Sequence, residues 1–134
     1  MLSRTGYTGE LGFELYGDHE HILEIWEELI NLGVEPCGLA SRDILRMEMK
    51  YCLYGNDIDE NTNPIEAGLS WITAMDKGCF IGKDQLIQNK SNYKLVAFKM
   101  LDRGIPRKNY DINCNNIKVG HVTSGTQSFA LNSG

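Results

Sequence analysis

The chain has 134 residues, of which 42% are apolar and 23% charged, which is ordinary for one modest folded domain and excludes a disordered segment. Its formal net charge of −5 and its lack of a long basic cluster make nucleic acid an unfavourable partner. No apolar run reaches the roughly 18 residues that span a bilayer, so we expect no membrane partner and a soluble, intracellular protein.

Residues 3–14 read SRTGYTGELGFE and hold three glycines within seven positions. Such a backbone turns tightly, and a tight turn can press Tyr7 against a ligand, although glycine also serves any plain turn. Leu11, Phe13 and Leu15 then alternate with small or polar residues, which predicts a strand with one apolar face.

The next element is predicted to be a helix over residues 19–32. Apolar residues recur along one stripe at helical spacing, and Trp26 lies in the middle of it, so we expect Trp26 in the core. Asp18 can accept hydrogen bonds from the first turn, and Gly33 can end the last one.

A second helix, buried on one side, is predicted over residues 39–50. Arg42 and Arg46 are four residues apart and share a face, and Asp43 lies at helical distance from Arg46. The plainer interpretation of these charges is a solvated surface with local ion pairs.

A loop rich in carboxylates and amides follows at residues 54–64, but it lacks the spacing of an EF-hand calcium loop. We interpret Asp57 and Asp59 as loop-shaping residues whose side chains accept hydrogen bonds from backbone N–H groups. Residues 65–72 are predicted to turn into a strand. Residues 77–90 are predicted to form a glycine-bounded loop and a short helix.

The polar, aperiodic run at residues 89–93 predicts a boundary between a region 1–90 and a region 91–134. Beyond it, residues 94–101 alternate and residues 118–123 give another short strand, which is typical of a small antiparallel β-barrel. The region 91–134 has room for about four strands, which is fewer than a closed barrel needs. The predicted fold class is therefore α+β, a mixed α/β region followed by a partial antiparallel β-barrel.

The four cysteines lie far apart in the sequence and never form a CxxC pair. Close pairs usually mark metal clusters and redox sites, so we expect free thiols in a reducing compartment. None of the three histidines has a second ligand at useful spacing. The sequence therefore predicts no metal site.

Six blocks of the sequence, in this order, resemble the aminomethyltransferase (T-protein) family of the glycine cleavage system: SRTGYTGELGFEL, CGLASRDILRMEM, LYGNDIDENTNPIEAGLSW, KGCFIGKDQL, RGIPR and VGHVTSGTQS. The resemblance covers almost the whole chain. Members of that family are much longer, and this sequence resembles their middle and the beginning of their C-terminal barrel. The resemblance thus leaves out their N-terminal half and their C-terminal end.

The resemblance implies a transfer of one carbon to tetrahydrofolate, the co-substrate, from the aminomethyl-lipoyl group of the partner H-protein. Ammonia is released and 5,10-methylenetetrahydrofolate forms. The family's folate-contacting positions are matched here by Tyr7, Glu14 and Arg42. By this resemblance Glu14 would accept hydrogen bonds from the pterin, and Tyr7 would pack against the pterin ring. Arg42 would supply a cation or orient Glu14. With no targeting segment visible, the resemblance favours a bacterial cytoplasmic protein over a mitochondrial one.

Two departures from the family leave alternatives open. The family's activating aspartate belongs to the N-terminal half, so we assign no catalytic residue and expect this chain alone to be inactive. The block KGCFIGK is similar to a signature of related folate-binding proteins linked to iron–sulfur cluster repair, in which the cysteine, here Cys79, is functional. A non-catalytic folate-binding scaffold, for which Cys79 should be exposed and activated, and an inactive structural fragment are the alternatives.

The barrel, as predicted, ends with an open strand edge near residues 123–126. Unpaired N–H and C=O groups beside the apolar residues Val96, Phe98 and Val119 would be a template for another chain. We therefore expect self-association through this edge, unless residues 127–134 fold back to cover it.

Overall fold

A computed structural model describes residues 1–88 and 92–134 of the chain. The chain divides into two compact units, Met1–Tyr51 and Cys52–Gly134. The boundary predicted at residues 89–93 falls mostly on residues 89–91, which lie outside the described residues, so the predicted regions 1–90 and 91–134 stay a prediction.

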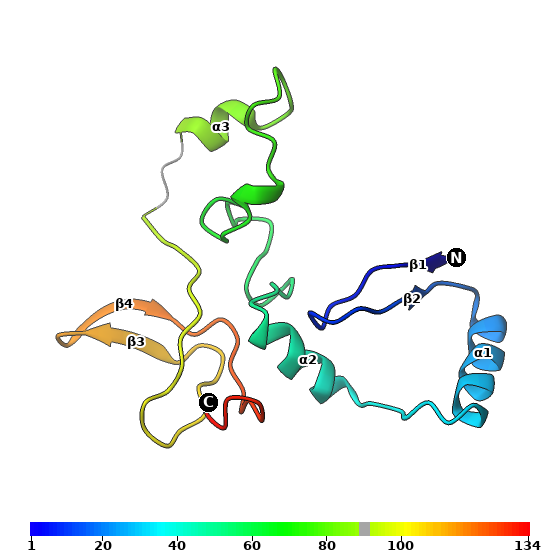
Figure 1. The fold of residues 1–134 in the computed structure, drawn as a ribbon. Helices are drawn as coiled ribbons and strands as arrows, with labels where there is room; N and C mark the ends of the chain where they lie inside the picture. The colour runs from blue at the N-terminus through cyan, green and yellow to red at the C-terminus, as the bar shows by residue number, and fades with distance from the viewer. Residues whose placement is uncertain (89–91) are drawn as a thin grey trace. The chain divides into compact units, whose positions relative to one another are not determined.

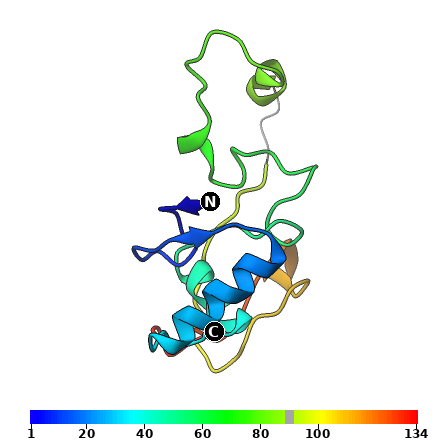
Figure 2. The same ribbon diagram turned by 90° about the vertical axis from the view of Figure 1, so that its right-hand side faces the viewer.

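The first unit begins with a small antiparallel sheet of β1 (Leu2–Ser3) and β2 (Glu14–Leu15). The glycine-rich segment is the loop that joins the two strands, as both ribbon views show (Figures 1 and 2). The prediction of a strand from Leu11 is wrong in extent: pairing reaches only from Leu2 opposite Leu15 to Ser3 opposite Glu14. Alternation alone does not make a strand where the ladder has no partner residue.

Helix α1 (His19–Asn31) confirms the first predicted helix. The Oδ1 atom of Asp18 accepts a hydrogen bond from the His21 amide at 3.1 Å, which is the predicted cap. At the other end Gly33 has a φ of +85°, and its amide donates to Ile30 O at 2.9 Å. The Val34 amide donates to Leu29 O at 3.0 Å, so the helix ends in a Schellman motif.

No residue of the apolar stripe of α1 is buried, although some of its members are half-buried. Trp26 is 52% exposed, so the prediction that it lies in the core is wrong. A helical stripe is buried only where a second element packs against it. In Figure 1 α1 stands apart from α2, to which an extended segment joins it.

Helix α2 (Leu39–Glu48) confirms the second predicted helix and ends two residues before the predicted end. Lys50 adopts a left-handed φ of +57°. Its amide donates to Met47 O at 2.8 Å, and the Tyr51 amide donates to Arg46 O at 2.8 Å. This is again a Schellman motif, with lysine at the position that glycine takes after α1.

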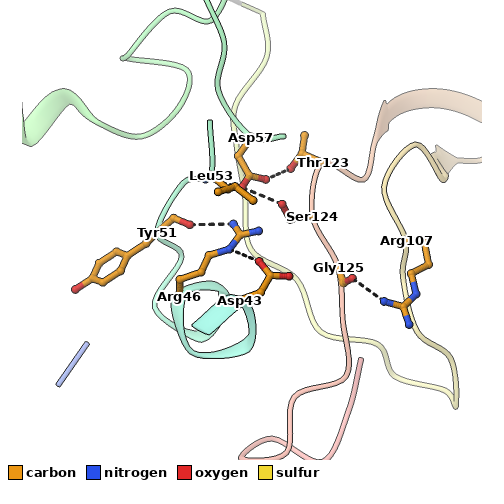
Figure 3. A network of polar contacts seen from close by, with 9 residues as sticks. All are labelled: Asp43, Arg46, Tyr51, Leu53, Asp57, Arg107, Thr123, Ser124 and Gly125. Atoms are coloured by element: carbon orange, nitrogen blue, oxygen red, sulfur yellow. Dashed lines mark hydrogen bonds and ion pairs between the residues drawn. The ribbon is translucent and has the colours of Figure 1, made fainter. Parts of the chain in front are cut away.

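The second unit is organised around the loop that contains Asp57 and Asp59. As predicted, both carboxylates accept hydrogen bonds from backbone amides, Asp57 from Leu53 at 3.0 Å and Asp59 from Asn61 at 2.9 Å. Asp57 also accepts hydrogen bonds from the hydroxyls of Thr123 and Ser124 (Figure 3). The loop is thereby tied to a segment far away in the sequence.

Two short helices follow in this unit. The 3-10 helix η1 (Ser70–Ile72) stands where the sequence predicted a strand, which is a correction. Thr73 Oγ1 donates to Leu69 O at 3.0 Å and holds this turn. Helix α3 (Lys83–Gln88) confirms the short helix, whose predicted end at Lys90 lies outside the described residues.

The second unit also contains an antiparallel hairpin of β3 (Asp111–Cys114) and β4 (Ile117–His121). Its turn residues, Asn115 and Asn116, have φ values of +50° and +63°, the left-handed pair of a tight hairpin turn. β4 confirms the predicted strand near residues 118–123, whereas residues 94–101 form no strand, contrary to the prediction.

The observed fold is α+β with two small antiparallel sheets, as the fold class predicted, while the partial β-barrel stays a prediction. Among the described residues, the buried apolar side chains are Ala67, Pro106 and Val122. No helix in residues 1–88 and 92–134 is long and apolar enough to cross a membrane.

Candidate functional site

The candidate site lies in the first unit, where the glycine-rich loop meets helix α2. Gly9 has a φ of +82°, and a Cβ atom at this position would lie 2.5 Å from the Cγ of Met49. Only glycine can adopt this backbone without strain and also admit the Met49 side chain so closely. The loop therefore packs against the end of α2, which fixes the neighbourhood of Tyr7.

Tyr7 and Arg42, two of the three predicted site residues, are in direct contact. The Arg42 guanidinium carbon lies 4.2 Å from the centroid of the Tyr7 ring, a cation–π arrangement. Tyr7 is half-buried, whereas Arg42 is exposed. A guanidinium carries five N–H donors in a planar fork that suits an anionic ligand, so an exposed Arg42 held against Tyr7 is a candidate cation for such a ligand.

A second aromatic ring, that of Tyr51, stacks on Tyr7. The two ring centroids are 5.8 Å apart and the ring planes differ by 29°. The sequence pattern did not predict Tyr51 as a site residue, because its ring reaches Tyr7 only after the backbone reverses direction at Lys50. The predicted helix end at residue 50 was the signal that could have indicated this reversal.

Glu14, the third predicted site residue, is held within the β1–β2 region. Its carboxylate accepts a hydrogen bond from the Thr5 hydroxyl. The pKa of Tyr16 is raised above its ordinary value of 10.0, mainly because its hydroxyl bonds to Glu14, with smaller effects of desolvation and of the Glu14 charge. The structure thus brings Tyr7 and Arg42 together in one contact and holds Glu14 in a separate set of bonds.

Arg46 is a buried residue of α2 whose side chain bonds both to Asp43 in the same helix and to the backbone of Tyr51 after it. It is only 2% exposed, so its prediction as part of a solvated surface is wrong. Its Nε donates to Asp43 Oδ1 at 2.8 Å, which confirms the predicted pair, and its Nη1 donates to Tyr51 O at 3.0 Å (Figure 3). A buried guanidinium requires such partners, since an unpaired buried charge is strongly destabilising.

Cys79 lies exposed in the loop before α3, and none of the four cysteines, all within the described residues, forms a disulfide. Exposure satisfies one of the two conditions that the iron–sulfur alternative sets for Cys79, and thiol reactivity is the other. Within the described part of the chain, no group of three His, Cys, Asp or Glu residues could hold a metal ion.

Comparison with known proteins gives one consistent family. Residues 1–77 match the family model of the GCVT N-terminal domain. The chain is similar to the aminomethyltransferase of Halothermothrix orenii, at 52% identity over 100% of the chain and 40% of that protein. It is also similar to the aminomethyltransferase of Bacteroides fragilis, at 47% identity over 96% of the chain and 38% of that protein.

A solved structure agrees with these relatives. The chain resembles the crystal structure of glycine cleavage system aminomethyltransferase T from Bartonella henselae with a TM-score of 0.84 and 29% sequence identity. The match covers 98% of this chain and 39% of the other. The chain therefore spans about 40% of the length of the relatives that it matches.

Proposed function

The chain belongs to the GCVT family of aminomethyltransferases, and we propose that it is the folate-side part of a glycine cleavage T-protein. The reaction would move the aminomethyl group of the lipoylated H-protein to tetrahydrofolate, releasing ammonia and forming 5,10-methylenetetrahydrofolate. Tetrahydrofolate supplies the nucleophilic nitrogen of this transfer. The family membership and the similarity to aminomethyltransferase T support the proposal.

The donor and acceptor groups of the site fit a folate. A pterin edge presents ring N–H and amino donors, which a carboxylate can accept as charge-assisted hydrogen bonds. Glu14 has two oxygens with about four acceptor positions, of which Thr5 and Tyr16 use two. Acceptor capacity therefore remains for a pterin, and the existing bonds would hold the carboxylate in one orientation.

The Tyr7–Arg42 contact is the observation that carries the proposal. It joins two predicted folate positions from segments far apart in the sequence, the glycine loop and α2. Arg42 would bind an anionic or carbonyl group of the folate through its in-plane N–H donors, while Tyr7 keeps the guanidinium from turning. Tyr7 thus would orient Arg42 as well as form a wall of the site.

Tetrahydrofolate binding to the purified chain, measured by anaerobic calorimetry, tests this proposal. Arg42→Met removes the cation and keeps much of the side-chain length, and we expect folate affinity to fall about ten-fold. The matched control is Lys94→Met, which removes an exposed cation from a segment outside the site. Equal affinity of the Arg42→Met variant and the unaltered chain would contradict the proposal, as would an absence of binding.

Catalysis is expected to need more than this stretch of chain. The chain matches about 40% of the relatives' length. The resemblance implies an activating aspartate in the N-terminal half of the family, which this chain does not resemble. Positioning and proton transfer each contribute large factors to such a reaction. With loaded H-protein and tetrahydrofolate, we expect the purified chain to form no 5,10-methylenetetrahydrofolate, and product formation would refute this expectation.

A further inference from the structure

We propose that Tyr51 is a positioning residue of the candidate folate site, which Arg46 fixes in place and which in turn fixes Tyr7 under Arg42. The inference rests on the proposed function for its ligand, but the arrangement itself is independent of folate. Tyr51 contacts the Tyr7 ring, and Tyr7 in turn contacts Arg42. Its effect would pass through the Tyr7 ring.

The first step is the anchoring of the Tyr51 backbone. Its amide donates to Arg46 O at 2.8 Å, and its carbonyl oxygen accepts from Arg46 Nη1 at 3.0 Å. The backbone N–H and C=O groups of Tyr51 are thus both bonded to Arg46. The Arg46 side chain is 2% exposed and also donates to Asp43. Hydrogen bonds inside such a poorly solvated place are stronger than at a surface.

The second step is the direction of the Tyr51 ring. Lys50 turns the backbone through a left-handed conformation, with φ at +57°, directly before Tyr51. In Figure 3 the Tyr51 ring extends away from the Arg46 guanidinium, and it stacks on Tyr7 at 5.8 Å between centroids. The buried Arg46 network therefore fixes the position of a ring that is itself 37% exposed.

The third step is the consequence for Arg42. Tyr7 belongs to a loop whose residues 4–13 lie outside helix and strand. A loop side chain keeps one orientation only where its neighbours restrict it. The Tyr51 ring supplies that restriction, and the Arg42 guanidinium lies 4.2 Å from the ring so positioned.

The test combines a spectroscopic signal with folate affinity. Protons of the Arg42 side chain lie over the Tyr7 ring, so their NMR resonances should be shifted upfield by its ring current. Tyr51→Leu removes the flat ring but keeps the backbone bonds to Arg46, and it should reduce this shift by about half or more. Because a stacked aromatic pair stabilises modestly, tetrahydrofolate affinity should fall roughly five-fold.

Two further variants show whether the aromatic ring or only the bulk matters. Tyr51→Phe retains the ring and should restore both the Arg42 shift and the affinity. Tyr51→Met retains apolar volume without a flat ring, so it should behave like Tyr51→Leu and replaces it if that variant does not fold. Helix content from circular dichroism should be equal in all variants, since the helix itself is unchanged.

The anchoring by Arg46 has its own variant. Arg46→Lys keeps the charge but lacks the fork that reaches Asp43 and Tyr51 O together. We expect an Arg42 shift between those of the unaltered chain and Tyr51→Leu.

An unchanged Arg42 shift in Tyr51→Leu would overturn the inference, and so would a reduced shift with unchanged folate affinity. If the unaltered chain binds no tetrahydrofolate, the proposed function fails, and the Arg42 shift alone then decides whether Tyr51 positions Tyr7. If Arg42→Met weakens binding but Tyr51→Leu does not, the function stands and the inference fails. The two hypotheses are therefore separable.

Discussion

At the scale of single residues, the bond between Glu14 and Tyr16 couples the site to pH. The pKa of Tyr16 is raised from 10.0, first by its hydrogen bond to Glu14. A raised pKa means that this stabilisation is fully present below pH 10.0 and is lost as the pH rises through the higher folded value. At neutral pH Tyr16 therefore remains a donor to Glu14.

Glu14→Gln should lower the pKa of Tyr16 toward its ordinary value. The substitution removes the negative charge, and the amide N–H can donate to the phenolate, so both changes favour the ionised form. Titration of tyrosinate absorbance measures this. Glu10→Gln, an exposed charge in the same loop, is the control and should leave the Tyr16 titration unaltered.

The same Glu14→Gln substitution should weaken tetrahydrofolate binding. A carboxylate that accepts two hydrogen bonds becomes a group that places a donor against a donor, which costs about 1.5 to 3 kcal/mol. The expected loss of affinity is ten-fold or greater. Calorimetry with Glu10→Gln as the charge-matched control checks this, and unchanged affinity would leave Glu14 as ordinary strand surface.

At the scale of elements, helices α1 and α2 end in the same motif with different residues at the left-handed position. Gly33 occupies it after α1 and Lys50 after α2, with φ values of +85° and +57°. A side chain at this position costs about 1 kcal/mol relative to glycine. Gly33→Ala should therefore lower the free energy of unfolding by about that amount, and Lys50→Gly should raise it slightly or leave it unchanged.

Urea denaturation followed by circular dichroism measures both substitutions. Glu35→Ala, beyond the end of α1, is a control that leaves both caps untouched. The expected result is a lower free energy of unfolding for Gly33→Ala and no loss for Lys50→Gly. Destabilisation by Lys50→Gly would mean that the lysine side chain contributes more than its backbone conformation costs.

The elements differ in how far the sequence predicts them. Helices could be predicted because their signals are local: in α1, Asp18 caps the first turn, Gly33 follows the last, and the apolar stripe lies between. Strands depend on a partner. The alternating residues 94–101 form no strand. The sequence did not predict β3, whose pairing with β4 depends on the left-handed Asn115–Asn116 turn.

The residues of the candidate site also differ in how far the sequence predicts them. Tyr7 and Arg42 could be predicted from motifs, and the structure brings them into contact. Tyr51 could not, because its place depends on the left-handed Lys50 and on a buried Arg46. Burial of Arg46 is itself a tertiary property that helical spacing does not reveal.

At the scale of the whole molecule, many large apolar side chains are exposed in this chain. Trp26, Val96, Phe98 and Val119 are 52%, 59%, 48% and 51% exposed. Exposed apolar surface of this kind marks interaction sites or a tendency to associate. Because burial depends on all elements that pack together, a sequence pattern predicts which face is apolar but not what covers it.

Self-association through the β3–β4 hairpin is the consequence we expect. The hairpin is a two-stranded sheet, so each strand has one strand neighbour among the described residues. The last residues bond to Met100, which lies outside the hairpin. The Met100 amide donates to Gly134 O at 2.9 Å, and the Ser133 hydroxyl donates to Met100 O at 3.0 Å. An outer strand edge with exposed apolar residues is a template for pairing with a second copy.

Analytical ultracentrifugation at micromolar concentration should therefore show dimers or larger species. Val119→Lys places a charge on β4, and charged residues on edge strands oppose such pairing, so the variant should sediment mainly as a monomer. Ile87→Lys is the matched control: it replaces an exposed apolar residue of α3, 55% exposed against 51% for Val119, and should associate as the unaltered chain does. A monomeric unaltered chain would refute edge pairing, and equal effects of the two lysines would assign association to general apolar exposure instead of the hairpin edge.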